Sequence, residues 1–539
     1  MAGCASQHGA RGPRTASAAP DEALTAVKWP DDLITTSERS DFQATETHAE
    51  VVAIMDRIAD RSPLATRATM GQTFEGRELP LLILADPPVS TASEAKDSGK
   101  LIVYLQAAIH GGEVCGKPAL LQLARDIALN DESPDRWLLE DMIIVMCPVY
   151  NADGNDRIEV GNRGSAQDGP ALGMGERANA QGFDLNRDHV KLESPEAQSL
   201  AAFLTEWNPH LTIDSHTTNG SLHEYALTYS APQNPSGHPA PIEFVRDQML
   251  PSVSETMESR TGLKSFFYGN FDRERTVWAT YSHMPRFATP YRGLRNRMSI
   301  LAEAYAYDTY EERVVSTREF IRECLYYAAA YRDDIVAILD LAERATVGGS
   351  SSAELVGIQY EIAAFDEPVT IPAFERIVDE SGEPTGELRS VEYTVDHYGW
   401  FEQTKSVVRP DGYIIAPELD QVVEKLRQHG VVIEQLPAIP SSAMIEQYVI
   451  GAVDHAERQF QGHHLTTVEV SDVVRLPCRE DRVPPGSWFV PMNQPLANLA
   501  IYLLEPESDD GLVAWGFVDG FLEVGGVFPV TRLVSSPLR

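Results

Sequence analysis

A histidine and a glutamate separated by two glycines give the clearest chemical signal in this sequence. His110-Gly111-Gly112-Glu113 ends the apolar run that begins at residue 101, which predicts a buried strand. An imidazole and a carboxylate at the end of one strand can bind the same metal ion. The glycines would let the backbone turn sharply and leave the open side of the metal free. Among 14 histidines, only His110 has a glutamate three residues later.

Two further strand ends offer the remaining parts of a catalytic metal site. Such a zinc site uses three protein ligands and keeps a fourth position open. The alternating strand 211–215 leads to His216, which can be the third ligand or an ordinary histidine at a surface turn. The apolar strand 298–302 leads to Glu303, where a carboxylate is costly unless it has a function. Beside a metal site, Glu303 could move protons as a general base and acid.

Residues 182–188, with the sequence Gly-Phe-Asp-Leu-Asn-Arg-Asp, predict a carboxylate clamp. Asn186 and the forked guanidinium of Arg187 can bind a carboxylate together. Asp184 can accept a proton from a ligand imidazole and fix its tautomer. The alternative is a loop with an aspartate cap and an exposed arginine.

Composition excludes several classes of protein. The formal net charge of −36 over 539 residues argues against nucleic acid or an anionic membrane as a partner, because both would be repelled. Five scattered cysteines without a C-x-x-C pair indicate neither a zinc ribbon nor a dense disulfide framework. No apolar run has the roughly twenty residues of a membrane span.

The order of elements predicts an α/β fold. Apolar periodicity predicts a helix in 41–61, a hairpin in 65–86, a helix in 117–129 and a strand in 142–149. Strand, helix and strand in succession predict a crossover and parallel strands, whose carboxyl ends gather ligands. We therefore expect a mixed, largely parallel sheet flanked by helices. A long helical region is expected over 311–343.

The chain is predicted to divide into three parts: a disordered leader over 1–35, a catalytic domain over 36–347 and a β-rich accessory domain over 352–539. A Gly- and Ser-rich break at 348–352 marks the last boundary. Within the accessory domain, 419–429 predicts the one helix, and runs such as 487–492 and 512–517 predict strands.

The N-terminus resembles the end of a bacterial lipoprotein signal, in which small residues precede a cysteine, here Cys4. The charged and apolar regions that come first in such signals are missing. A true start further upstream would predict export, to the periplasm or with a lipid anchor on Cys4. The start as given predicts a cytoplasmic protein.

Over residues 45–345 the blocks H-G-G-E, N-A-D-G, D-L-N-R-D, D-S-H-T-T-N-G and a glutamate ending an apolar strand resemble, in this order, the M14 family of zinc carboxypeptidases. The segment G-L-R-N-R before S-I-L-A-E-A-Y and the block 494–508 resemble a bacterial subgroup of larger members with a C-terminal β-rich domain. The arginines of 268–297 are then expected to line the pocket.

The resemblance implies one zinc ion and a role for each site residue: His110, Glu113 and His216 as ligands, Glu303 as base and acid, Asn186 and Arg187 on the substrate carboxylate, and Asp184 orienting His110. The family also uses an arginine to stabilise the oxyanion, for which Arg163 is the first choice and Arg177 the second. For the tyrosine that caps the substrate, Tyr281 is the first choice and Tyr291 the second.

The predicted function is hydrolysis of a C-terminal peptide bond, with a peptide bearing a free terminal carboxylate as substrate. Two other hydrolases remain alternatives: an N-acyl amino acid deacylase similar to aspartoacylase, and an amidase acting on peptidoglycan stem peptides. A catalytically inactive peptide-binding protein is the alternative from another class. The complete ligand set and Glu303 argue against it.

Overall fold

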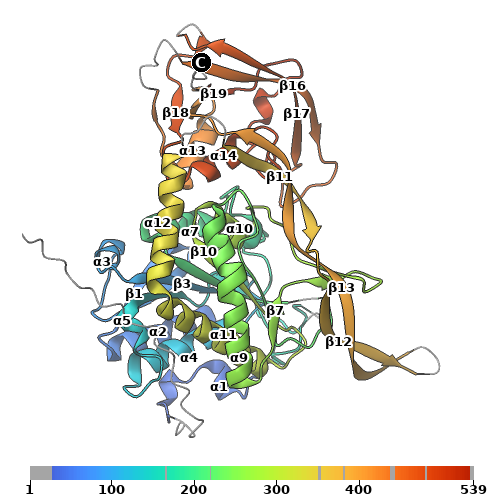
Figure 1. The fold of residues 1–539 in the computed structure, drawn as a ribbon. Helices are drawn as coiled ribbons and strands as arrows, with labels where there is room; N and C mark the ends of the chain where they lie inside the picture. The colour runs from blue at the N-terminus through green and yellow to red at the C-terminus, as the bar shows by residue number, and fades with distance from the viewer. Residues whose placement is uncertain are drawn as a thin grey trace, which may run out of the picture.

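A mixed eight-stranded sheet lies at the centre of the first part of the chain in the computed structural model (Figure 1). The structure describes residues 27–163, 167–218, 220–349, 354–379, 383–436, 443–479 and 482–534. The strand order is β1 (Ala65–Gln72), β2 (Glu78–Leu84), β4 (Met142–Cys147), β3 (Leu101–Ala107), β5 (Leu211–Thr217), β10 (Met298–Ala304), β6 (Leu227–Ser230) and β7 (Ser265–Phe267). The four central strands β4, β3, β5 and β10 run parallel, which confirms the predicted fold class.

Helices cover both faces of this sheet. One face packs against α2 (His48–Arg61), α4 (Gly116–Leu129), α9 (Leu250–Thr261) and α11 (Tyr310–Ala330). The other packs against α3 (Ala92–Asp97), α7 (Pro195–Trp207) and α10 (Ala288–Leu294). Strand β3 shows why its sequence is continuously apolar: Val103 points into the first core and Tyr104 into the second, and both are fully buried.

The predicted helix over 311–343 is two helices. It breaks at Tyr331, between α11 and α12 (Arg332–Gly348). Helix α12 leads from the first part of the molecule to the C-terminal part (Figure 1).

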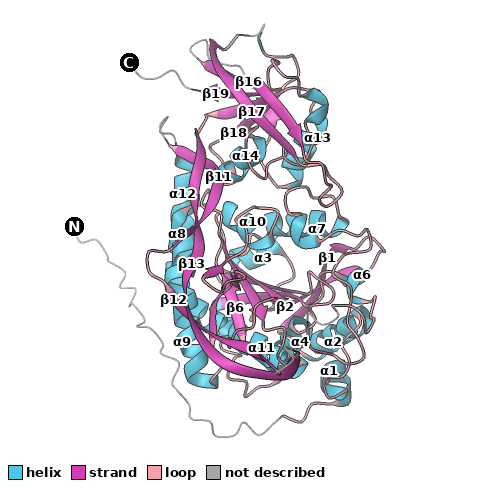
Figure 2. Ribbon diagram, turned by 90° about the vertical axis from the view of Figure 1, so that its right-hand side faces the viewer, coloured by secondary structure: helices cyan, strands magenta, loops and turns pink. Residues whose placement is uncertain are grey.

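Two sheets form most of the C-terminal part (Figure 2). The first contains β11 (Leu355–Ala364) and the 25-residue β13 (Pro384–Val408), which also pairs with β12 (Val369–Val378). The second has the order β15 (Glu434–Gln435), β18 (Trp488–Pro491), β14 (Gly412–Ile415), β19 (Val530–Val534), β16 (Met444–His455) and β17 (Thr466–Pro477).

The first of these sheets crosses the predicted boundary at 348–352. Strand β13 pairs in parallel with β9 (Val277–Ala279), which in turn pairs with β8 (Asn270–Phe271). The hydrophobic core on the α3, α7 and α10 face of the eight-stranded sheet also continues into the C-terminal part. Tyr291 and Leu294 belong to the same buried cluster as Val490 and Trp515. The two parts are therefore joined by hydrogen bonds and by a shared core.

Some sequence-based expectations differ from the structure. Residues 512–517 form turns, in which Trp515 is fully buried, so the apolar pattern marks a buried loop and the predicted strand is wrong. Besides α13 (Asp420–Gln428), the region holds a second helix, α14 (Ala497–Leu504), whose residues are all buried and so show no amphipathic pattern. Within the predicted leader, Asp31–Leu33 form a 3-10 helix.

Cys4 and the rest of residues 1–26 lie outside the described residues. The four cysteines that are described, Cys115, Cys147, Cys324 and Cys478, are buried free thiols. In the described part of the chain, no helix combines the length and the hydropathy of a membrane-spanning segment.

The buried imidazole of His429 makes the junction between the two parts sensitive to acid. Its Nδ1 accepts a hydrogen bond from the Tyr291 hydroxyl at 2.8 Å, and its Nε2 lies 2.9 Å from the Val190 carbonyl oxygen. Burial lowers the pKa of His429 to about 3. Between about pH 6.5 and pH 3 the unfolded chain binds a proton here that the folded chain does not, so stability falls as the pH falls.

We therefore predict that His429 alone lowers the free energy of unfolding by about 2 kcal/mol between pH 7 and pH 5. In His429→Gln, which keeps a polar side chain but cannot titrate, this part of the pH dependence should disappear. Urea unfolding of both proteins at the two pH values measures it. An equal pH dependence in the two proteins would contradict the prediction.

Candidate metal centre and catalytic pocket

The loop that follows β3 carries two of the candidate ligands. The backbone turns at Gly111 and Gly112, where the Glu113 amide donates to the His110 carbonyl oxygen at 2.9 Å. Neither glycine has a positive φ, whereas Ala108 before them has a φ of 54°. The two glycines serve close approach of the backbone. A Cβ on Gly111 would lie 2.4 Å from the carbonyl carbon of Gly154, and one on Gly112 would lie 2.6 Å from the Gly175 oxygen. The sharp turn expected at these glycines is present, and in addition they allow this close approach of the backbone.

His110, Glu113 and His216 form one buried group that could hold a metal ion. One ligand atom from each residue lies within 4.8 Å of the other two. The Nδ1 atoms of both imidazoles are 3.0 Å from Glu113 Oε2. Within the described structure, the buried Nδ1 of His110 has no hydrogen-bond partner. Two nitrogens and a carboxylate converging on one point match the ligands that Zn²⁺ prefers.

An aspartate lies behind each imidazole. Asp184 Oδ1 is 3.1 Å from His110 Nε2, as the sequence analysis anticipated. Asp214 Oδ2 is 3.3 Å from His216 Nε2, a contact that it did not identify. The strand pattern contained the signal, since Asp214 and His216 are two residues apart on β5 and point to the same face. Both Nδ1 atoms are thereby turned towards Glu113.

Glu303 stands beside this group because of the parallel pairing of β10 with β5. In that register Glu303 is the partner of His216. Burial raises the pKa of Glu303 to about 7, although His216 opposes the shift. A carboxyl group that titrates near neutral pH is suited to accept and return a proton.

The candidate residues line one cavity of about 170 Å³. Seven of the predicted site residues line it: His110, Glu113, Asn186, Arg187, His216, Tyr281 and Glu303. Arg177, the second choice for the oxyanion, also lines it. The walls are completed by residues that the sequence analysis had not proposed for the site: Thr217, Tyr268, Phe287, Ala288, Thr289 and Leu301.

The predicted carboxylate clamp is fixed by the segment that precedes β10. The Ala288 amide donates to Asn186 Oδ1 at 2.9 Å. The Arg187 guanidinium lies over the Phe287 ring, 3.9 Å from its centre, and is partly exposed to the cavity. Both clamp side chains are therefore held by the backbone or ring of residues 287–288.

The two candidate arginines occupy different places. Arg163 is 8% exposed, donates to Glu113 Oε1 at 2.8 Å and does not line the cavity. Arg177 is 39% exposed and lines it, with Nη1 3.6 Å from Glu113 Oε1 and Nη2 2.8 Å from Asp184 Oδ2. Of the two tyrosines, Tyr281 lines the cavity, whereas Tyr291 is buried against His429.

The arginines expected to line the pocket from 268–297 do not line this cavity. Arg286 is buried on Asp510, to which its amide and guanidinium donate at 2.7 and 2.9 Å. Further along the segment, Arg292, Arg295 and Arg297 face Asp214, the His429 carbonyl and Glu343 respectively. Their role is to fix the segment, since a buried guanidinium requires such partners.

Comparison with known proteins gives a consistent result. Residues 51–261 match the model of the family described as zinc carboxypeptidase. Carboxypeptidase 2 of Trichophyton rubrum and of Trichophyton equinum are each 24% identical to this chain over 478 residues, which are 85% of this chain and 81% of each relative. Among solved structures, a metallo-carboxypeptidase from Pseudomonas aeruginosa shows 19% identity and a TM-score of 0.39, over 53% of this chain and 68% of that chain.

We predict that Asp184→Asn weakens Zn²⁺ binding by about 10- to 100-fold, because an amide cannot accept the imidazole proton as a carboxylate does. Competition for Zn²⁺ against a chromophoric chelator measures the affinity. The exposed Asp97→Asn serves as the matched control. Equal affinities of the three proteins would show that Asp184 does not support His110.

Proposed function

We propose that this chain is a zinc carboxypeptidase, which removes the C-terminal residue of peptides with one zinc ion held by His110, Glu113 and His216. The observation that supports this best is the shared cavity. It contains the metal-binding group, a carboxyl group that titrates near neutrality and a carboxylate clamp. If the C-terminal carboxylate of a peptide bound in the clamp, the last amide bond of the peptide would lie next to the metal-binding group and Glu303.

Each proposed role follows from one position in the cavity. Bound zinc would polarise the scissile carbonyl and lower the pKa of a water molecule to about 7. Glu303 would take that proton and return it to the leaving amine, which its raised pKa favours. Asn186 and Arg187 would fix the free carboxylate, so that hydrolysis is restricted to the chain end. Tyr281 would cover the bound residue.

We assign stabilisation of the oxyanion to Arg177. Its guanidinium is accessible from the cavity, whereas that of Arg163 is occupied by Glu113 and the Thr217 carbonyl oxygen. A donor aimed at developing negative charge must face the substrate. Arg163 would instead balance the buried charge of Glu113.

Glu303→Gln is expected to lower kcat by about 10²- to 10⁴-fold while zinc content stays unchanged, because the amide cannot accept the proton. Mass spectrometry of a peptide ladder and metal analysis measure both properties, with the exposed Glu255→Gln as control. Full activity in Glu303→Gln would exclude the proposed base. Cleavage of N-acetyl amino acids, with no shortening of peptides, would favour a deacylase.

The two arginines should respond differently to substitution. Arg177→Gln is expected to retain zinc and to lose about 10²- to 10³-fold in kcat. Arg163→Gln is expected to weaken zinc binding, with most of kcat restored at saturating zinc. Titration of activity with Zn²⁺ for both variants distinguishes the roles. The reverse pattern would assign the oxyanion to Arg163.

A further inference from the structure

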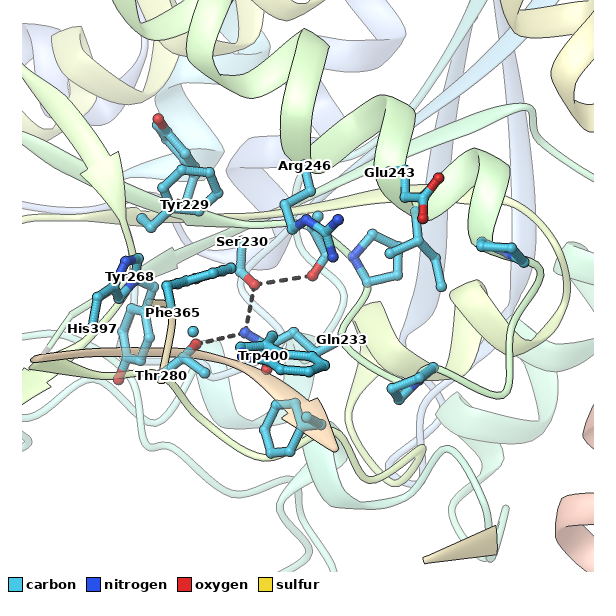
Figure 3. Close-up of a pocket in the computed structure, with 18 residues that line it drawn as sticks. Tyr229, Ser230, Gln233, Glu243, Arg246, Tyr268, Thr280, Phe365, His397 and Trp400 are labelled. Atoms are coloured by element: carbon cyan, nitrogen blue, oxygen red, sulfur yellow. Dashed lines mark hydrogen bonds between the residues drawn. The ribbon is translucent and has the colours of Figure 1, made fainter. Parts of the chain in front are cut away.

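A second cavity, larger than the catalytic one, lies between the catalytic sheet and the C-terminal part (Figure 3). Its volume is about 310 Å³. One wall comes from the end of β6 and the residues that follow it, including Ser230 and Gln233. The opposite wall comes from the C-terminal part and includes Phe365, His397 and Trp400, and the charged side chains of Glu243 and Arg246 also line the cavity.

This cavity adjoins the catalytic pocket through a single layer of side chains. Tyr268 lines both cavities. Ser230, which lines the second cavity, pairs in register with Leu301, which lines the catalytic pocket. Thr280 lines the second cavity, and the next residue, Tyr281, lines the catalytic pocket. The ring of Tyr268 packs edge-on against Tyr281, with 5.7 Å between centres. The two cavities are therefore neighbours, with Tyr268 as a shared wall.

The chemistry of the walls suits an aromatic group that carries one polar hydrogen. Tyr268, Phe365 and Trp400 offer ring faces and edges for stacking. Two polar atoms are buried without a hydrogen-bond partner in the described structure: Nε2 of His397 and Oε1 of Gln233. His397 is only 8% exposed. The Gln233 amide nitrogen is already used, since it donates to Ser230 Oγ at 2.9 Å and to Thr280 Oγ1 at 2.5 Å (Figure 3).

Gly399 lets Phe365 and His397 pack closely against the backbone of the C-terminal wall. A Cβ at this position would lie 2.5 Å from Phe365 and 2.8 Å from His397 Nε2. The position of the His397 ring in this wall therefore requires a residue without a side chain at 399.

We propose that this cavity binds an aromatic side chain of the peptide substrate, with tyrosine preferred over phenylalanine. This inference rests on the proposed carboxypeptidase function and adds that the C-terminal part selects the substrate. The aromatic rings bind the ring of the ligand, and His397 with Gln233 pairs its hydroxyl group. A tyrosine thus satisfies buried atoms that a phenylalanine leaves without partners.

The test uses peptides with tyrosine, phenylalanine or alanine at the last, second-last or third-last position. In the wild-type protein, one position should show kcat/KM about tenfold higher for tyrosine than for alanine. Trp400→Ala should lose most of this ratio, because Trp400 is 37% exposed on the wall and its removal spares the core. Phe521→Ala, an aromatic residue 45% exposed outside the cavity, should keep it.

A second variant, His397→Phe, keeps the ring and removes the polar nitrogen. It should retain the preference for aromatic residues and lose the preference for tyrosine over phenylalanine. Binding of the same peptides to zinc-loaded Glu303→Gln, with and without Trp400→Ala, gives a readout independent of turnover. Cleavage of peptides without any aromatic preference, or a preference unchanged in Trp400→Ala, would overturn the inference and leave the proposed function intact. If no peptide were shortened at its C-terminus but tyrosine peptides still bound more tightly, the proposed function would be overturned and the aromatic binding site would stand.

Discussion

The buried carboxylate of Glu113 is the constraint on which the rest of the site depends. Burial alone would raise its pKa, but His110 and Arg163 hold the pKa well below the usual range, so the group stays charged. A buried charge without such partners would cost several kcal/mol. Its partners come from three separate segments: the loop after β3, the end of β5 and the loop that contains Arg163. The centre can therefore form only when the parallel sheet has brought these segments together.

The C-terminal part reaches the substrate clamp through a short series of contacts. Asp510 fixes Arg286, and the next two residues hold Arg187 and Asn186. Gln461 accepts a hydrogen bond from the amide of Asp184 at 2.9 Å, which supports the aspartate behind His110. The region thus acts as a scaffold for the residues of the proposed site. The Asp510–Arg286 and Gln461–Asp184 contacts are not fully exposed, unlike the surface ion pairs that contribute little to stability.

Sequence patterns predicted that His110, Glu113 and His216 lie together, because parallel strands end at the same edge of a sheet. His110 and His216 each follow an apolar run, so their convergence needed no knowledge of loops. The choice between Arg163 and Arg177 did require knowledge of the loops. Both arginines lie in a long segment without hydrophobic periodicity, so the sequence does not predict its conformation. The buried arginines before β10 were assigned to the pocket, since their partners, such as Asp510, lie 224 residues away. The buried turn around Trp515 looked like a strand for a related reason: burial on all sides leaves no pattern of exposure.

The pairing of β13 with β9 has a consequence for how the enzyme is made. Synthesis of a chain proceeds from the N-terminus, and domains usually fold as they emerge. Here all three proposed metal ligands have been synthesised once the chain reaches residue 216. In contrast, β9 can pair only after Asp396–Tyr398 have been made, and Arg286 can bind Asp510 only after residue 510 has been made. The contacts that fix the proposed clamp are therefore completed only near the end of translation. In a nascent chain, the proposed metal ligands are thus synthesised long before the segment that positions Asn186 and Arg187 finds its last partner.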